Sequence, residues 1–186
     1  MKTERTQRRR LILAVSGVKN SGKTTLITKI LPFLKAKGLN VAVIKHDGHD
    51  FEADVPETDS WKFAKAGADG TLVFSKTKYM MIHYDTVLPE EDLLASFPRA
   101  DIILLEGFKY SKYSKIEIIR KGNSAKSVCD SKNLLGIVTD LNKEELKEQK
   151  VLETEKWEKQ IKIFDLNQTG SLAEWIYQLW EEIQKR

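Results

Sequence analysis

The sequence has a single cysteine, Cys129, and this excludes a fold held together by internal disulfide bonds. It also lacks any run of about 18 consecutive apolar residues, the length that a membrane-spanning helix requires. The polar N-terminus is followed by an apolar stretch that is too short for a signal peptide. Together these absences predict a cytoplasmic protein with no membrane partner.

The sequence also has no large excess of positive or negative residues: its formal net charge is +4. Much of that excess lies in residues 1–10, where Arg8, Arg9 and Arg10 offer a contact for nucleic acid or for an acidic partner. No aromatic residues are interleaved with these arginines, as they are in many nucleic-acid surfaces. We therefore predict a flexible basic tail at residues 1–10, and we do not expect nucleic acid as a partner.

What the sequence does contain is a regular alternation of strand-like and helix-like segments. Short apolar runs predict strands at residues 11–16, 41–45, 71–75, 79–84, 102–105, 116–119, 134–139 and 161–164. Amphipathic or capped segments predict helices at residues 24–37, 59–66, 89–97, 142–150 and 171–184. This order predicts an α/β fold with a mostly parallel sheet, helices on both faces and one antiparallel hairpin.

The most specific pattern is the phosphate-binding loop G-x-x-x-x-G-K-[ST]. The sequence matches it with Gly17, Val18, Lys19, Asn20, Ser21, Gly22, Lys23 and Thr24. The loop follows a predicted strand and opens a predicted helix, which is the structural context that the motif requires. Residues 11–186 are therefore predicted to form a single P-loop nucleotide-binding domain with a three-layer, P-loop NTPase-like fold.

The chemistry of this loop follows from its residue types. Backbone N–H groups, freed by the glycines and by the start of a helix, form a nest for phosphate oxygens. Lys23 brings a positive charge to the β- and γ-phosphates, and the Thr24 hydroxyl is a ligand for Mg²⁺. Thr25 is predicted to contact an earlier phosphate. A glycine turn that only caps a helix is the alternative, but such a turn has no need of Lys-Thr after it.

A carboxylate for the same Mg²⁺ is predicted at the end of the apolar strand 102–105. Mg²⁺ in phosphate sites is often held by an acidic residue that ends a strand beside the loop. Glu106 ends this strand and Asp101 begins it. Ligands of open α/β sheets bind at the carboxyl ends of the strands, so we favour Glu106 over Asp101 as metal ligand and catalytic residue. A surface charge at a strand end is the alternative for Glu106.

The segment after the strand 41–45 should lie at the same edge of the sheet. Lys45 and His46 are placed to reach a phosphate or a second anion. Three interpretations stay open for this segment: a functional loop near the nucleotide, which we favour, a solvated loop, and a metal site. The metal site would use His46, Asp47, His49 and Asp50.

Several segments, taken together and in order, resemble one protein family. They are the loop 17–24, Ile44-Lys45-His46-x-x-His49-x-Phe51, residues 59–68 (DSWKFAKAGA), Glu106-Gly107-Phe108-Lys109, residues 115–120 (KIEIIR) and Thr139-Asp140. This set resembles the molybdopterin-guanine dinucleotide biosynthesis protein B family and spans residues 11 to 140.

The resemblance implies a P-loop protein that binds GTP, hydrolyses it weakly with Mg²⁺ and forms a homodimer. Its partners would be the guanylyltransferase that attaches GMP to molybdopterin and, as a further candidate, molybdopterin itself. By the same resemblance, Asp59 becomes a candidate second acidic residue near Mg²⁺ or water. Lys109 becomes a candidate anion contact.

The sequence matches a complete motif for the phosphates but only part of the usual motif for the base. Regulatory GTPases read guanine with Asn/Thr-Lys-x-Asp, whereas this chain has Thr139-Asp140 without the lysine. Asp140 can still accept hydrogen bonds from guanine N–H groups, so Thr139 and Asp140 are nucleotide-binding candidates and ATP stays open. Neither an arginine finger nor a residue that orients water is recognisable, which predicts slow hydrolysis. The alternatives are a small-molecule or nucleoside kinase using ATP, and a scaffold that binds nucleotide for structure only.

Overall fold

The structure is a computed structural model that describes residues 9–49, 51–84, 87–124, 126–148 and 161–186. Within these ranges no helix is both long enough and apolar enough to cross a membrane. The chain forms two compact units: unit 1 comprises Met1–His46 with Phe97–Arg186, and unit 2 comprises Asp47–Ser96. The single domain predicted for residues 11–186 stays a prediction, and most of the predicted tail, residues 1–8, lies outside the described ranges.

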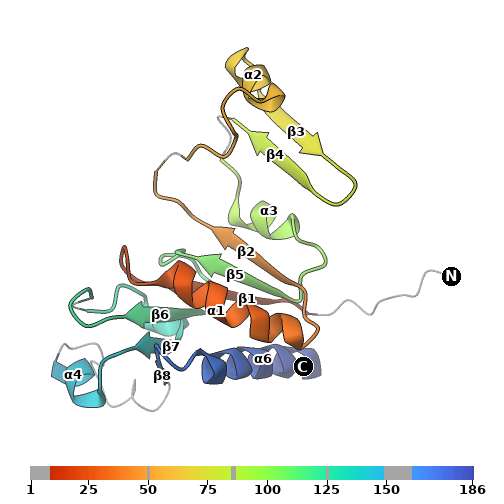
Figure 1. Ribbon diagram of the computed structural model, residues 1–186. Coiled ribbons are helices and arrows are strands. Elements are labelled where there is room, and N and C mark those ends of the chain that lie inside the picture. Colours follow the sequence, from red (N-terminus) through yellow and green to blue (C-terminus); the bar gives the residue numbers. More distant parts are fainter. Residues whose placement is uncertain (1–8, 50, 85–86, 125, 149–160) are drawn as a thin grey trace. The chain divides into compact units, whose positions relative to one another are not determined.

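Unit 1 is built on a sheet of six parallel strands (Figure 1). Its strands are β1 (Leu11–Ser16), β2 (Val41–Lys45), β5 (Ile102–Glu106), β6 (Lys115–Ile119), β7 (Leu134–Thr139) and β8 (Lys162–Asp165). They lie in the order β2-β5-β1-β6-β7-β8, and every neighbouring pair is parallel. The carboxyl ends of the strands therefore meet at one edge of the sheet, where ligands of open α/β folds bind.

Two long helices pack together on one face of this sheet. They are α1 (Lys23–Ala36) and the C-terminal α6 (Thr169–Lys185) (Figure 1). Leu26, Ile30 and Leu34 of α1 and Ile176 of α6 are buried in the core cluster that also contains alternate residues of β1, β5 and β6. This burial follows from the apolar stripe that each helix presents at helical spacing.

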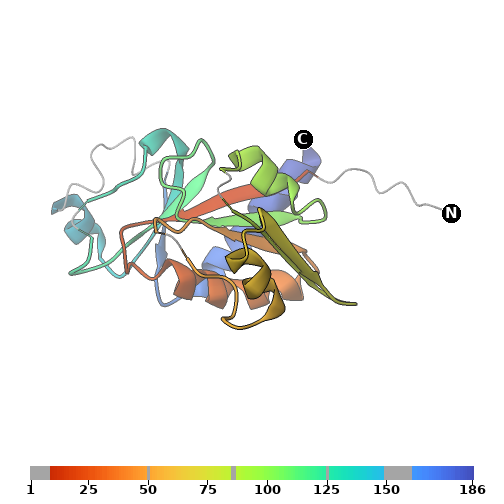
Figure 2. The ribbon, with the colours of Figure 1, turned by 90° about the horizontal axis from the view of Figure 1, so that it is seen from above.

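The other face carries a second, smaller cluster. It contains Ile119, Ile137 and Leu146, which belong to β6, β7 and the short helix α4 (Lys143–Glu148) (Figure 2). A capping box begins α4, because the Asn142 side chain accepts the Glu145 N–H while the Glu145 carboxylate accepts the Asn142 N–H, each at 2.9 Å. A 3₁₀ turn, η1 (Ser131–Asn133), precedes β7. The sequence did not indicate it.

Unit 2 contains α2 (Asp59–Lys65), the hairpin β3 (Gly70–Phe74) and β4 (Tyr79–His83), and α3 (Glu90–Ala95). The cross-strand pairs Leu72–Met81 and Phe74–Tyr79 share one face of the hairpin. All four side chains are at least half exposed. Exposed apolar patches on a protein surface are candidates for interaction surfaces.

The predicted fold class is confirmed by the six-stranded parallel sheet and the separate antiparallel hairpin. The predicted strands and helices are present, with small shifts at their ends, such as Lys162–Asp165 for the strand expected at 161–164. The last two residues of the helix expected at 142–150 lie outside the described ranges.

Candidate phosphate-binding site

Only glycine fits the backbone at the first position of the loop between β1 and α1. Gly17 has φ 143°, and a Cβ placed on it would lie 2.7 Å from Ser21 Oγ and 2.8 Å from Ile118 O. The loop is thus packed directly against strand β6. Gly22, with φ 97°, turns the chain into α1 and serves as its N-cap. Both positions have a positive φ, which glycine adopts readily, and Gly17 also has no room for a side chain.

The N–H groups of this loop remain available as donors. Among the described residues, the backbone N–H groups of Gly22, Lys23 and Thr24 donate no hydrogen bond, whereas Ser21 N–H reaches Val18 O at 3.3 Å. The buried Ser21 hydroxyl has no hydrogen-bond partner within the same residues. Buried or converging donors without partners are rare, and at the start of a helix they form an anion-binding nest.

Lys23 lies over this loop. Its Nζ donates to Val18 O at 2.7 Å and to Gly17 O at 3.3 Å. Burial lowers the pKa of Lys23 below that of an ordinary lysine, and Glu106 partly opposes this shift by favouring the charged form. The positive charges of Lys109 and Lys45 lower the pKa further. Repulsion among these three ammonium groups is relieved when a polyanion binds between them.

Glu106 and Thr24 meet beside the loop. The Thr24 hydroxyl donates to Glu106 Oε1 at 2.7 Å, and the Glu106 side chain is buried at the carboxyl end of β5. A hydroxyl and a carboxylate are the hard oxygen ligands that Mg²⁺ prefers, so this pair fits the predicted metal. Asp101 lies at the opposite end of β5, where its carboxylate accepts the Asn40 N–H at 2.8 Å.

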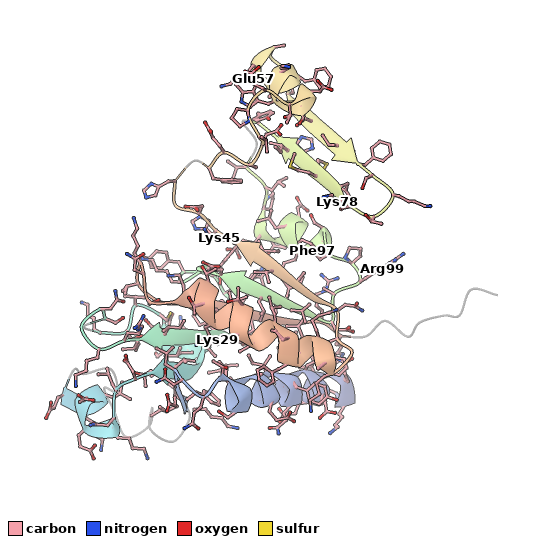
Figure 3. All side chains as sticks on the ribbon, in the orientation of Figure 1. Lys29, Lys45, Glu57, Lys78, Phe97 and Arg99 are labelled. Atoms are coloured by element: carbon pink, nitrogen blue, oxygen red, sulfur yellow. The ribbon has the colours of Figure 1, made fainter. Side chains whose placement is uncertain are left out.

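The segment that follows Glu106 turns sharply toward the end of β2. Gly107 and Phe108 both have positive φ values, 96° and 44°. His46 donates its N–H to Glu106 O at 3.1 Å, and its ring packs edge-on against the Phe108 ring with centroids 5.8 Å apart. Lys45 is the last residue of β2, so it lies at the same edge of the sheet (Figure 3). The structure therefore brings His46 and Lys45 to the phosphate side of unit 1.

The candidate base contacts, Thr139 and Asp140, lie at the end of β7. Thr139 is buried, and its hydroxyl accepts the Leu141 N–H at 3.0 Å, which fixes the turn that presents Asp140. Asp140 accepts the Lys121 N–H at 2.8 Å. A pocket of about 350 Å³ opens beside this carboxylate, lined by Thr139, Asp140, Leu141, Asn142, Ile163, Phe164, Asp165 and Asn167. Its acidic lining suits a ligand that presents N–H donors.

Two residues that the sequence interpretation did not assign also lie against the loop. Arg120 Nη1 lies 3.9 Å from the position of a Cβ on Gly22, and Asn123 Nδ2 donates to Lys19 O at 3.3 Å. Both follow β6, which pairs with β1. The signal that could have found Arg120 is its place after a buried strand, since the carboxyl ends of parallel strands converge.

Asp59 is the predicted site residue that belongs to unit 2, where it begins α2. Its role in catalysis stays a prediction. Among the residues that the structure describes, no three His, Cys, Asp or Glu side chains come together as a metal site of their own.

A parallel sheet with this strand order and a glycine-bounded loop of free N–H groups before a helix defines the class of P-loop nucleotide-binding proteins. The model of the family "Molybdopterin guanine dinucleotide synthesis protein B" matches residues 12–140. The chain belongs to this family.

Individual proteins agree with that assignment. A relative from Escherichia coli (strain K12), named molybdopterin-guanine dinucleotide biosynthesis adapter protein, is 38% identical over 119 residues, which are 60% of this chain and 66% of the relative. A relative of the same name from Haemophilus influenzae is 34% identical over 113 residues, 59% of this chain and 64% of the relative. The chain thus spans just under two thirds of the length of these relatives. The crystal structure of Bacillus subtilis MobB aligns with this chain with a TM-score of 0.67 and 25% sequence identity. The alignment covers 90% of this chain and 96% of the Bacillus subtilis chain.

Proposed function

We propose that this protein is a GTP-binding adapter in the synthesis of molybdopterin guanine dinucleotide and that it assists the enzyme that joins GMP to molybdopterin. The observation that carries the proposal is the loop 17–24: within the described residues its Gly22, Lys23 and Thr24 N–H groups donate no hydrogen bond, and the Lys23 ammonium group lies against the loop carbonyl of Val18. The family membership and the adapter names of the two relatives support the biological role.

The phosphates would lie in the loop, from Gly17 to Thr25. Lys23 would leave its present carbonyl partners in part and pair with the β- and γ-phosphates, while Lys45, His46 and Lys109 approach from the side of β2 and β5. Thr24 and Glu106 would hold Mg²⁺, which neutralises charge on the phosphate oxygens when it is bound.

The preference for guanine over adenine rests on Asp140 and the pocket beside it. Guanine presents two N–H donors on its Watson–Crick edge, and a carboxylate can accept both of them. The Asp165 carboxylate in the same lining adds acceptor character. ATP offers one amino group and an acceptor nitrogen at the same edge, so it would leave part of this acceptor capacity unpaired.

We also propose weak, Mg²⁺-dependent GTP hydrolysis. Lys23 would stabilise charge that develops on the transferred phosphoryl group, and Glu106 and Asp59 are the carboxylates proposed to position the attacking water. Glu106 already accepts the Thr24 hydroxyl, and no arginine finger is recognisable in the sequence. Hydrolysis is therefore proposed to be slow.

The partners proposed are the guanylyltransferase, molybdopterin as an additional ligand, and a second copy of this chain. The exposed hairpin face of Leu72, Phe74, Tyr79 and Met81 supports the homodimer. In a dimer with two-fold symmetry both copies present the same patch, and an apolar face on paired strands can pack against itself.

The experiment that tests the proposal is a reconstitution with purified guanylyltransferase, molybdopterin, GTP and Mg²⁺, in which formation of the guanine dinucleotide is measured. We expect the wild-type protein to stimulate the reaction and Lys23→Ala to abolish the stimulation. The matched control is Lys29→Ala, an exposed lysine of the same helix (Figure 3), which should stimulate like the wild type. Tighter binding of ATP than of GTP, or stimulation that survives Lys23→Ala, would overturn the proposal.

A further inference from the structure

Arg120 has no role in the proposal above, yet its guanidinium group lies between the two halves of the candidate nucleotide site. It follows β6, and its Nη1 atom lies 3.9 Å from the position of a Cβ on Gly22 in the phosphate loop. Its Nε atom lies 3.9 Å from Asp140 Oδ2 at the end of β7. One side chain therefore lies close both to the loop that would bind the phosphates and to the carboxylate that would bind the base.

The strand order explains why this place matters. Strand β6 lies between β1, which ends at the phosphate loop, and β7, which ends at the pocket beside Asp140. A nucleotide with its phosphates in the loop and its base in the pocket must pass the end of β6. Its ribose and the adjoining face of its base would then lie against Arg120.

Strand β7 itself supplies no cation to the candidate base site. Strand β7 and the residue after it read Leu-Leu-Gly-Ile-Val-Thr-Asp and contain no lysine or arginine. The positive charge beside Asp140 comes instead from Arg120, which follows β6. A guanidinium group is planar and stacks on aromatic rings, which an ammonium group cannot do.

Arg120 is also free to change partners. Its side chain is 44% exposed, and its ion pair with Asp140 is long. Exposed ion pairs contribute little to stability, so a ligand can displace this one readily. Asp140 keeps its hydrogen bond from the Lys121 N–H, which holds the carboxylate in place when Arg120 moves onto a ligand.

We infer that Arg120 is a nucleotide-contacting residue that binds the nucleoside half of the ligand, covering the ribose and the face of the base while Asp140 reads the edge of the base. This inference rests on the proposed function, since it requires a nucleotide in the phosphate loop. In this inference the positively charged side chain beside the base comes from the end of β6, not from β7.

The test compares two ligands that share phosphates and differ in the nucleoside: Mg²⁺-GTP and inorganic tripolyphosphate with Mg²⁺. Dissociation constants are measured by calorimetric titration of the full chain. We expect Arg120→Ala to weaken GTP binding by about tenfold or more and to weaken tripolyphosphate binding by a clearly smaller factor. Arg120→Lys, which keeps the charge and loses the planar group, should weaken GTP binding by a smaller factor.

The controls separate this inference from the proposed function. Arg99→Ala removes the same charge at the opposite edge of the sheet (Figure 3) and should change neither constant. Lys23→Ala should weaken both ligands. Equal losses for GTP and tripolyphosphate in Arg120→Ala, or no loss for GTP, overturn the inference while the proposed function stands. A wild-type protein that binds neither ligand defeats the proposed function itself. Arg120→Lys gives the same comparison if Arg120→Ala fails to fold.

Discussion

The ammonium group of Lys23 lies in surroundings that weaken its hold on a proton. Burial lowers its pKa, and the nearby charges of Lys109 and Lys45 act in the same direction, while Glu106 opposes them. Lys23 should therefore lose its proton at a pH below the ordinary lysine value of 10.5. A bound polyphosphate stabilises the charged form, so binding and protonation of Lys23 favour each other.

The resulting prediction concerns affinity at alkaline pH. Because the charged form binds phosphate, affinity for tripolyphosphate should fall as the pH rises through the lowered pKa of Lys23. Tripolyphosphate is the suitable probe because guanine itself loses a proton in this range. Calorimetric titrations between about pH 7 and 10 measure the fall, and Lys23→Arg, which stays charged throughout, should give a flatter profile. Identical profiles for the two proteins would show that Lys23 does not hold the phosphates.

At the scale of single residues, the sequence predicted the chemistry of the loop but not which neighbouring atoms make glycine necessary at Gly17. Gly17 was expected from the motif, yet its close neighbours are Ser21 Oγ and Ile118 O, and the second of these belongs to a distant strand. Contacts of this kind depend on which strand lies beside β1. A motif read along the chain does not contain that information.

Among the elements, strand β6 carries an uncommon set of buried charges. Glu117 is 1% exposed, and its carboxylate accepts the Ser127 hydroxyl and the Val128 N–H, the latter at 2.7 Å. These bonds tie residues 127–129 to the face of the sheet that α4 also covers. Burial, with a further contribution from Glu117, raises the pKa of the adjacent Cys129 thiol to about 12.

This arrangement predicts an unreactive cysteine. Only a very small fraction of the Cys129 thiol is ionised at pH 8, so its reaction with a thiol reagent should be on the order of a hundredfold or more slower than in the unfolded chain. Glu117→Ala removes both acceptors and should increase the rate, while Glu117→Gln keeps one acceptor and should increase it less. Absorbance assays of native and unfolded protein measure these rates. A native rate equal to the unfolded rate would show that Glu117 does not hold the segment closed.

The elements themselves were predictable because each has a local signal. The capping box of Asn142 and Glu145 marks the start of α4, and the apolar spacing of Leu172, Trp175 and Ile176 marks the buried side of α6. The order of strands across the sheet has no such signal. Arg120 was therefore left without a role, because its place depends on β6 lying between β1 and β7.

For the whole molecule, the chain divides into two units: the exposed apolar surface belongs to unit 2 and the phosphate loop to unit 1. Unit 2 presents Leu72, Phe74, Tyr79 and Met81 on one face of its hairpin, with exposed fractions from 53% to 77%. The sequence predicted the hairpin but not this face as a surface, because alternate residues on both faces of the strands are apolar.

A homodimer through this face makes a prediction about mass in solution. Phe74→Ser combined with Tyr79→Ser removes both aromatic side chains of the patch, which are also its two most exposed residues, and should shift the protein from dimer to monomer. Val87→Ser changes another exposed apolar residue of unit 2, outside the hairpin, and should leave the dimer intact. Sedimentation equilibrium over a range of concentrations measures the mass. A wild-type monomer, or a double variant with the mass of the wild type, would rule out this interface.

The site as a whole depends on whether the loop 17–24 encloses a polyphosphate. The most direct measurement is a ¹⁵N–¹H NMR titration with Mg²⁺-GTP that follows the backbone amides of Gly22, Lys23 and Thr24, which donate no hydrogen bond within the described residues. New hydrogen bonds to phosphate oxygens should move these amide protons strongly downfield, and Lys23→Ala should need far more GTP for the same change. Saturation with GTP while these three amides keep their positions would contradict a phosphate site in this loop.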